Sequence, residues 1–500
     1  MGTVGTVGTV GTVGTVGTVV AVDAGTSGVR AVAVSETGEV ADLAYREIAQ
    51  HYPRPGWVEQ DPLEIWEGVR ATLAEVAQRQ AAGGGTVAAV GIANQRETAV
   101  AWDRRTGQPL HHAIVWQDRR TAARCRELLE AGHLAAVRSR TGLVLDPYFS
   151  ATKYAWLLDE GGLAPGGGLP GDLALGTVDS WLLWQLTGGT AGGVYATDVT
   201  NASRTLLFDI GELSWSGELC DLFGVPPAAL AEVRPSCGRL GTVAATAVDG
   251  ALAGVPVSGM AGDQQAALLG QACVEPGMAK VTYGTGSFVL ANAGRAVPPP
   301  PEGLVATVAW DLGDHGAGVA YALEGSAFAS GAAVQWLRDE LGLVDRTEDV
   351  GPLAESVPDS GGLTVVPAFT GLGSPWWDPH ARGTVTGITR GTGRAQLARA
   401  VVEAMAFQVR DMVEAMGAAT GVPCTELRAD GGAAAMDLLL RLQADQVGVP
   451  VTRPRSVETT ALGAAMLAGL AEGVWGSVGE VAALWRPDVE HRPAADRAVA

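Results

Sequence analysis

Two short turns rich in glycine and threonine constrain the fold of this chain more than any other feature of its sequence. The first lies within "VVAVDAGTSGVRAVAVS", near the start, and the second within "MAKVTYGTGSFVLAN", near the middle. Each turn joins two runs of small and β-branched residues, a pattern that predicts two strands connected by a tight turn. The backbone N–H groups of such turns form concavities that bind anions, and their hydroxyl groups add further donors. We therefore expect two similar lobes that close on phosphate groups.

The segments that follow the first turn predict an α/β fold. "EVADLAYREIAQ" is expected to form a further strand. Asp61 and Pro62 are expected to begin a helix, with Glu64 completing a capping box, and "TVAAVGIA" is expected to be a buried strand. This succession favours a mainly parallel sheet whose ligands bind at the carboxyl ends of the strands. Residues 160–172 and 293–303 are expected to be surface loops because of their glycine and proline content.

The chain opens with six copies of Gly-Thr-Val, and a period of three matches neither a strand nor a helix. We expect residues 1–17 to form a low-complexity tail, with Thr18 to Val22 supplying the first strand. A signal peptide is not expected, because this stretch has no basic region and cleavage would destroy the turn that follows.

The charge balance and the cysteines limit the classes of partner. The chain carries 34 Lys and Arg against 54 Asp and Glu, a net charge of −20, so it repels nucleic acid and anionic lipid heads. We expect neither nucleic-acid binding nor membrane insertion. The five cysteines are an odd number without metal-ligand spacing, which indicates reduced thiols in a cytoplasmic protein.

Longer stretches carry a family resemblance. They include "YPRPGWVEQDPLEIW", "GIANQRET", "AIVWQDRRT", "DVTNASRTLLFDI", "GMAGDQQAALLGQACVEPGMAKVTYGTGSF", "YALEGSAF" and the segments 148–160 and 383–403. With these stretches the sequence resembles the glycerol kinases of the FGGY carbohydrate kinase family. The resemblance implies an α/β fold of two ribonuclease-H-like (actin-like ATPase) lobes with the active site in the interdomain cleft. It places the substrate and phosphate lobe at residues 18–270 and the nucleotide lobe at residues 271–500.

The same resemblance implies the reaction. ATP with Mg2+ is expected to phosphorylate glycerol to sn-glycerol 3-phosphate, as the entry step of glycerol catabolism, by in-line transfer with an aspartate as general base. The resemblance also implies a homo-oligomer, either a dimer or a tetramer.

Asp263 is the candidate for that general base. It lies between a predicted strand and a predicted helix in "GMAGDQQ", so it is expected at the carboxyl end of a strand. The alternative for such a residue is an ordinary helix N-cap. The resemblance assigns Asp263 to the base and adds contacts to the acceptor from six further residues: Arg96, Glu97, Trp116, Tyr148, Gln264 and Phe288. Without the resemblance, Arg96 and Glu97 would be interpreted as a surface pair, and the two aromatic residues Trp116 and Phe288 as core.

Nucleotide contacts follow from the two turns and from glycines farther along the chain. By resemblance the phosphate contacts are Thr26, Ser27, Gly28 and Arg30 in the first turn and Thr285 and Gly286 in the second. The nucleoside contacts are Gly331, Gln335 and Gly432, and Asp23 holds Mg2+. The chain departs from the family pattern at Ala24, at Gly28 with Val29, and at Met436, which puts the detail of the ATP contacts in question.

Two other functions stay open at this point. One is a sister kinase for xylulose, gluconate or another polyol, which the "NQRET", "IVWQ" and "DPYFS" motifs disfavour. The other is a non-catalytic actin-like module that binds nucleotide, and a complete acceptor pocket argues against it.

Overall fold

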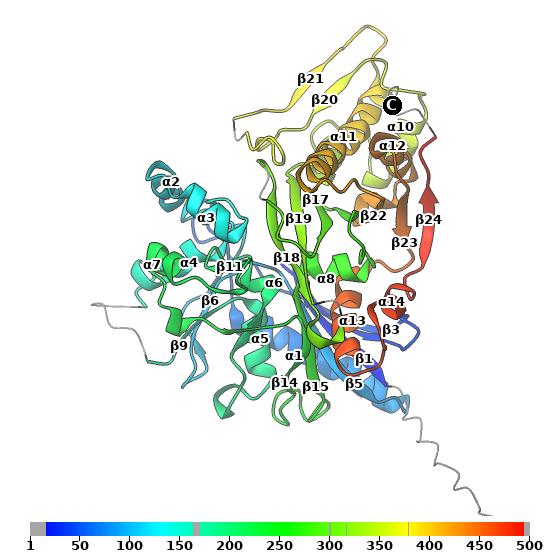
Figure 1. Cartoon of the computed structure of the whole chain (residues 1–500). Coiled ribbons are helices and arrows are strands. Elements are labelled where there is room, and N and C mark those ends of the chain that lie inside the picture. The colour runs from blue at the N-terminus through cyan, green and yellow to red at the C-terminus, as the bar shows by residue number, and fades with distance from the viewer. Residues whose placement is uncertain (1–16, 164–170, 300–301, 317, 379, 495–500) are drawn as a thin grey trace, which may run out of the picture.

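The computed structural model describes residues 17–163, 171–299, 302–316, 318–378 and 380–494. The expected tail lies outside these residues except for Gly17, and so do the middle of the expected loop 160–172 and residues 300 and 301 of the loop 293–303. Two mixed sheets, each with helices packed on it, form the centres of two lobes (Figure 1). None of the helices within the described ranges is long and apolar enough to cross a bilayer.

The first sheet has six strands in the order β3-β2-β1-β5-β15-β14. β1 pairs in parallel with β5, and β5 with β15, whereas the other three pairings are antiparallel. The strands are β1 (Thr18–Ala24), β2 (Gly28–Val34), β3 (Val40–Glu47), β5 (Val87–Asn94), β14 (Cys237–Thr242) and β15 (Pro256–Gly262).

The second sheet repeats this order and adds one strand at an edge. Its order is β18-β19-β17-β16-β22-β23-β24, and its two central pairings, β16 with β22 and β22 with β23, are parallel. The strands are β16 (Met278–Tyr283), β17 (Ser287–Gly294), β18 (Val305–Asp311), β19 (Val319–Ala327), β22 (Glu426–Asp430), β23 (Val451–Pro454) and β24 (Pro487–His491). The two Gly/Thr turns occupy equivalent positions, between β1 and β2 and between β16 and β17, so the expected repetition of the unit is confirmed.

The expectation of a mainly parallel sheet is wrong for both lobes. A turn of three residues, such as 25–27 or 284–286, can join only antiparallel neighbours, because a parallel pair needs a long crossover. The strands on one side of β1 and of β16 therefore form antiparallel meanders. The parallel pairings begin only after a helix has carried the chain back across the sheet.

The helix α1 (Pro62–Ala82) is the crossover between β3 and β5. Asp61 is its N-cap and accepts a hydrogen bond from the backbone N–H of Leu63. The expected capping box does not form, because the carboxylate of Glu64 accepts the N–H of Ala49 instead. The helix packs on one face of the first sheet, and β1 alternates accordingly. Val20 and Val22 face α1, whereas Val19 and Ala21 join the core on the other face.

The other face of the first sheet is covered by α13 (Thr459–Ala471), which comes from near the end of the chain (Figure 1). Glycines permit the close approach of α13. A Cβ built on Gly91 of β5 would lie 2.2 Å from the carbonyl oxygen of Ala464. A Cβ on Gly463 of α13 would lie 1.8 Å from the carbonyl oxygen of Ala266 in α8 (Asp263–Gly270). The backbones of α8 and α13 thus touch directly.

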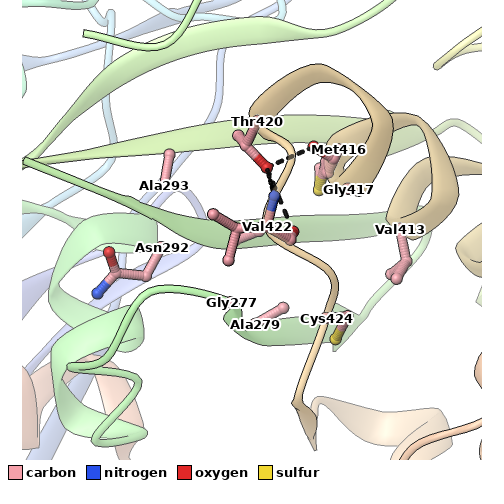
Figure 2. A pocket seen from close by; sticks show the side chains of 11 residues that line it. Gly277, Ala279, Asn292, Ala293, Val413, Met416, Gly417, Thr420, Val422 and Cys424 are labelled. Carbon is pink, nitrogen blue, oxygen red and sulfur yellow. Dashed lines mark hydrogen bonds between the residues drawn. The ribbon is translucent and has the colours of Figure 1, made fainter. Parts of the chain in front are cut away.

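The core of the second lobe lies between its sheet and the helices α11 (Arg394–Thr420) and α12 (Asp437–Val447). At the end of α11, Thr420 donates a hydrogen bond to the carbonyl of Met416 and accepts one from the N–H of Val422, above β16 and β17 (Figure 2). The cavity beside them has a volume of about 10 Å3. That volume suits one water molecule at most, so the cavity is a packing gap.

Smaller elements complete the two lobes. The helices are α2 (Ala122–Glu130), α3 (Leu134–Thr141), α4 (Ser150–Asp159), α5 (Val178–Leu186), α6 (Val199–Ala202), α7 (Gly217–Phe223), α9 (Gly331–Asp339), α10 (Val350–Glu355) and α14 (Val478–Ala482). The strands are β4 (Glu59–Gln60), β6 (Val100–Asp103), β7 (Gln108–Pro109), β8 (Ala113–Ile114), β9 (Leu173–Gly176), β10 (Ala196–Asp198), β11 (Phe208–Asp209), β12 (Ser214–Trp215), β13 (Glu232–Arg234), β20 (Thr364–Val366) and β21 (Thr384–Thr386).

The contact between α8 and α13 makes a testable prediction. Gly463→Ala places a methyl group against the carbonyl of Ala266, so the helices must separate, and we expect the free energy of unfolding to fall by about 3 kcal/mol. Gly217→Ala is the control, because a Cβ there meets open space at the start of α7, and its effect should stay within about 0.5 kcal/mol. Urea unfolding followed by circular dichroism measures both, and equal stabilities would contradict the prediction.

Candidate active site

Arg96 is the centre of the candidate site. It follows β5, and its side chain is 2% exposed. Its Nη2 donates to the hydroxyl of Tyr148 at 3.2 Å, and its Nε lies 3.2 Å from Oδ1 of Asp263. Its Nη1 donates to Glu324 at 2.5 Å and to Gln265 at 3.2 Å. Three of the residues expected at the acceptor therefore meet, and Arg96 is not part of a surface pair.

Glu97 has the left-handed backbone conformation, with φ of 61°. This conformation costs a non-glycine residue about 1 kcal/mol or more and persists only where the surroundings hold it. Here the Oγ of Ser150 donates to the backbone carbonyl of Glu97, and the Nε of Arg204 donates to its carboxylate at 2.6 Å. These two contacts hold the strained backbone in place and fix the carboxylate of Glu97 beside Arg96.

Arg204 and Glu324 are site residues that the sequence did not single out. Arg204 follows α6, and Glu324 lies in β19 of the second lobe. Glu324 accepts from Arg204 at 2.9 Å with one carboxylate oxygen and from Arg96 with the other. A carboxylate inside the apolar run "VAYALEGSA" was the signal that could have found Glu324, because a buried charge needs a partner.

The pKa values in this cluster follow from burial and from the two arginines. Burial raises the pKa of Glu324, but Arg204 and Arg96 outweigh it and hold this pKa at about 2. Burial also raises the pKa of Glu97, and the same two arginines offset only part of that effect. Glu324 is therefore the carboxylate that stays ionised most firmly.

Asp263 is the first residue of α8, directly after β15. The N-cap of α8 is Gly262, so the N-cap alternative for Asp263 is wrong. The N–H of Gly262 donates to the hydroxyl of Thr200 at 2.9 Å, which holds the backbone just before the carboxylate. Burial raises the pKa of Asp263, while Arg96 and then Lys280 act to lower it. With a side chain that is 28% exposed, Asp263 is accessible to solvent.

Two aromatic residues join the acceptor residues to the first turn. The ring of Trp116 lies edge-on to that of Tyr148, with the centroids 5.5 Å apart, and its Nε1 donates to the hydroxyl of Thr26 at 2.9 Å. Neither Trp116 nor Phe288, on β17, is fully buried, so neither is a simple core residue. The place of Phe288 at the acceptor stays a prediction.

The first turn brings charged groups together at the carboxyl end of β1. Arg30, on β2, lies 3.7 Å from the carboxylate of Asp23 and donates to Glu458 at 2.8 Å. Ser27 is exposed in the turn, whereas Gly28 is buried. A Cβ on Gly28 would lie 2.4 Å from the hydroxyl of Tyr45. Glycine at position 28 thus follows from the packing of Tyr45.

The environment of Asp23 fits a divalent cation. The pKa of Asp23 is raised to about 7. Burial is the largest cause, Arg30 acts to lower this pKa, and the carboxylates of Asp263 and Glu458 act to raise it. A cation bound beside Asp23 would stabilise the ionised carboxylate and so lower this raised pKa. Within the described ranges no cluster of three or more His, Cys, Asp or Glu residues is arranged to hold a metal. The donor set therefore suits Mg2+ that keeps water and phosphate oxygens as its other ligands.

The second lobe contains a cavity of about 580 Å3. Four of the residues expected at the nucleotide line it: Thr285, Gly331, Gln335 and Gly432. Met436, one of the positions at which a departure from the family pattern was noted, also lines it. Gly286 and the residues of the first turn, Thr26, Ser27, Gly28 and Arg30, are not among its lining residues. A Cβ on Gly286 would lie 2.3 Å from the carbonyl oxygen of Ala327, so the second turn is packed closely onto β19.

The buried charge cluster makes a prediction about stability. Arg204→Met leaves Glu97 and Glu324 without one of their cations, so we expect a loss of about 3–5 kcal/mol in the free energy of unfolding. The control is Arg124→Met, which removes an exposed pair with Glu127 and should cost under about 1 kcal/mol. Urea unfolding measures both, and a near-native stability of Arg204→Met would overturn this account of the cluster.

Comparisons with known proteins show the family of this chain. Residues 18–270 match the N-terminal domain of the FGGY family of carbohydrate kinases and residues 279–472 its C-terminal domain. A glycerol kinase of Trichlorobacter lovleyi is 54% identical over 92% of this chain and 91% of its own. The structure of Plasmodium falciparum glycerol kinase with ADP has a TM-score of 0.90 at 32% identity, covering 96% of this chain and 95% of that one. Xylulose kinase from Rhodospirillum rubrum has a TM-score of 0.84 at 25% identity, over 95% and 94% of the chains. The chain belongs to the FGGY family of carbohydrate kinases.

Proposed function

We propose that this protein is a glycerol kinase, which transfers the γ-phosphoryl group of ATP to a terminal hydroxyl of glycerol and releases sn-glycerol 3-phosphate and ADP. The observation that carries the proposal is the set of contacts made by the buried Arg96, which joins Asp263, Tyr148 and Glu97 in one cluster. These groups offer fixed donors and acceptors to a small polyol. A site that satisfies each hydroxyl rejects an acceptor lacking one, because its own polar groups would be left unpaired.

On the acceptor side, Asp263 is the general base. It takes the proton of the attacking hydroxyl as that oxygen bonds to phosphorus and the bond to the ADP oxygen breaks. Arg96, Glu97 and Tyr148 hold the hydroxyls, Gln264 contributes a further contact, and Trp116 and Phe288 pack against the carbon chain. Because Trp116 also donates to Thr26, the acceptor pocket and the first phosphate turn are held together.

On the nucleotide side, the nucleoside occupies the 580 Å3 cavity beside Gly331, Gln335 and Gly432. The phosphates extend from there to Thr285 and Gly286 and to the first turn with Thr26, Ser27, Gly28 and Arg30. Asp23 would hold Mg2+, which when bound would supply positive charge to offset the negative charge of the phosphates.

We also propose the organisation of the protein. Residues 18–270 form the lobe with the substrate contacts and 271–500 the lobe that binds nucleotide, with α13 of the second segment packed on the first sheet. The protein is a homo-oligomer, a dimer or tetramer. Its five free cysteines favour a cytoplasmic location.

A coupled ADP-release assay tests the activity. The purified protein is given MgATP with glycerol, dihydroxyacetone, xylulose, gluconate or no acceptor. We expect release with glycerol well above that with the other acceptors. Activity confined to xylulose or gluconate would move the protein to a sister kinase of the family, and no activity with any acceptor would overturn the proposal.

The role of Asp263 makes a prediction about pH. Because burial raises the pKa of Asp263 above 3.8, kcat/KM should fall as the pH is lowered through this raised value, where the base becomes protonated. Asp263→Asn should cut kcat by about 10²–10⁴ and remove that acid limb, with little change in glycerol binding. Near-normal turnover of this variant would exclude Asp263 as the base.

A further inference from the structure

Lys280 is a buried cation that the proposed mechanism does not use. It lies on β16 and is 0% exposed. Its Nζ donates to Oε1 of Gln264 and, at 2.8 Å, to the hydroxyl of Thr282. An ammonium group has three donors and no acceptor, and it is costly to bury without partners. Lys280 therefore depends on the two oxygen atoms that face it.

The donor and acceptor roles of the groups next to Lys280 are also fixed. The hydroxyl of Thr282 accepts from Lys280 and donates its proton to Oδ1 of Asp430 at 2.6 Å. The other oxygen of Asp430 accepts from Gln271 at 2.8 Å and from Thr459 at 2.7 Å. A carboxylate only accepts and an ammonium group only donates. The hydrogen bonds therefore lead in one direction, from Lys280 through Thr282 to Asp430.

The same reasoning fixes the amide of Gln264. The oxygen and nitrogen of a glutamine side chain can exchange places, but the nitrogen would set two donors against the donors of Lys280. Oε1 therefore faces Lys280, and Nε2 is turned away from it. None of the described residues accepts a hydrogen bond from Nε2, and the Gln264 side chain is not fully buried.

We infer that Lys280 is a positioning residue that orients the Gln264 amide so that its N–H group, and not its oxygen, faces the bound acceptor. This inference rests on the proposed function, because it assigns the oxygen that receives the hydrogen bond to glycerol. Gln264 then donates to a glycerol hydroxyl oxygen, while its neighbour Asp263 accepts the proton of the attacking hydroxyl. Adjacent residues at the start of α8 thus supply opposite hydrogen-bonding roles.

The electrostatics of the site support this arrangement. Burial lowers the pKa of Lys280, and the carboxylates of Asp430 and Asp263 act in the opposite direction. Lys280 in turn acts to lower the pKa of Asp263, after the larger effect of Arg96.

A double-mutant cycle tests the inference through the KM for glycerol and for ATP, with thermal unfolding as the control for structure. Lys280→Met frees the amide to turn, and we expect the glycerol KM to rise about tenfold, the equivalent of one weakened hydrogen bond, with the ATP KM unchanged. Gln264→Met should raise the glycerol KM by a similar or larger factor. In the double variant the rise should be no greater than in Gln264→Met, because Lys280 acts through that amide.

Gln264→Glu keeps an oxygen against Lys280 but replaces the donor in the cleft by an acceptor. We expect this variant to fold normally and to raise the glycerol KM about tenfold or more. Independent effects of Lys280→Met and Gln264→Met, or a native KM for Gln264→Glu, would overturn the inference. If Lys280→Met does not fold, Gln264→Glu alone decides the question. A wild-type protein that is inactive with glycerol would refute the proposed function instead.

Discussion

The cluster of proposed acceptor residues depends on the buried guanidinium group of Arg96. The carboxylates of Glu97, Asp263 and Glu324 all lie within 4 Å of it, and without a cation between them these groups would repel one another in a low-dielectric environment. Arg96 follows a strand of the first sheet, whereas Glu324 belongs to a strand of the second. The site is therefore not carried by either lobe alone, and its geometry is set where the two sheets approach each other.

Local patterns predicted much of this arrangement. The strands on both sides of each Gly/Thr turn and the position of Asp263 between a strand and a helix could be read from neighbouring residues, because turns and periodicity are local properties. The pairing of Glu324 with Arg96 joins residues 228 positions apart, so no local pattern could reveal it. The strand directions were also mispredicted, because a succession of strands and helices along the sequence does not show which neighbouring strands pair in an antiparallel meander. The roles of the individual residues came from family resemblance, not from spacing.

The two lobes repeat the same fold but carry different polar residues at equivalent positions. β5 and β22 occupy the same place in their sheets, and both end in a polar residue. Asn94, at the end of β5, exchanges hydrogen bonds with Asn201 beside the acceptor residues. Asp430, at the end of β22, instead anchors Thr282 and Thr459. The equivalent strands of the two lobes thus end in different residues, an amide that pairs with another amide in the first lobe and a carboxylate that accepts from two hydroxyl groups in the second.

The position of α13 has a consequence for how this protein is made. During synthesis the strands of the first sheet leave the ribosome long before residues 459–471 do, and until then the face that α13 covers lacks this helix. Val19 and Ala21 are fully buried on that face in the finished molecule. The nascent chain therefore leaves part of this apolar face uncovered until α13 has emerged, and only then can the first lobe reach its native packing.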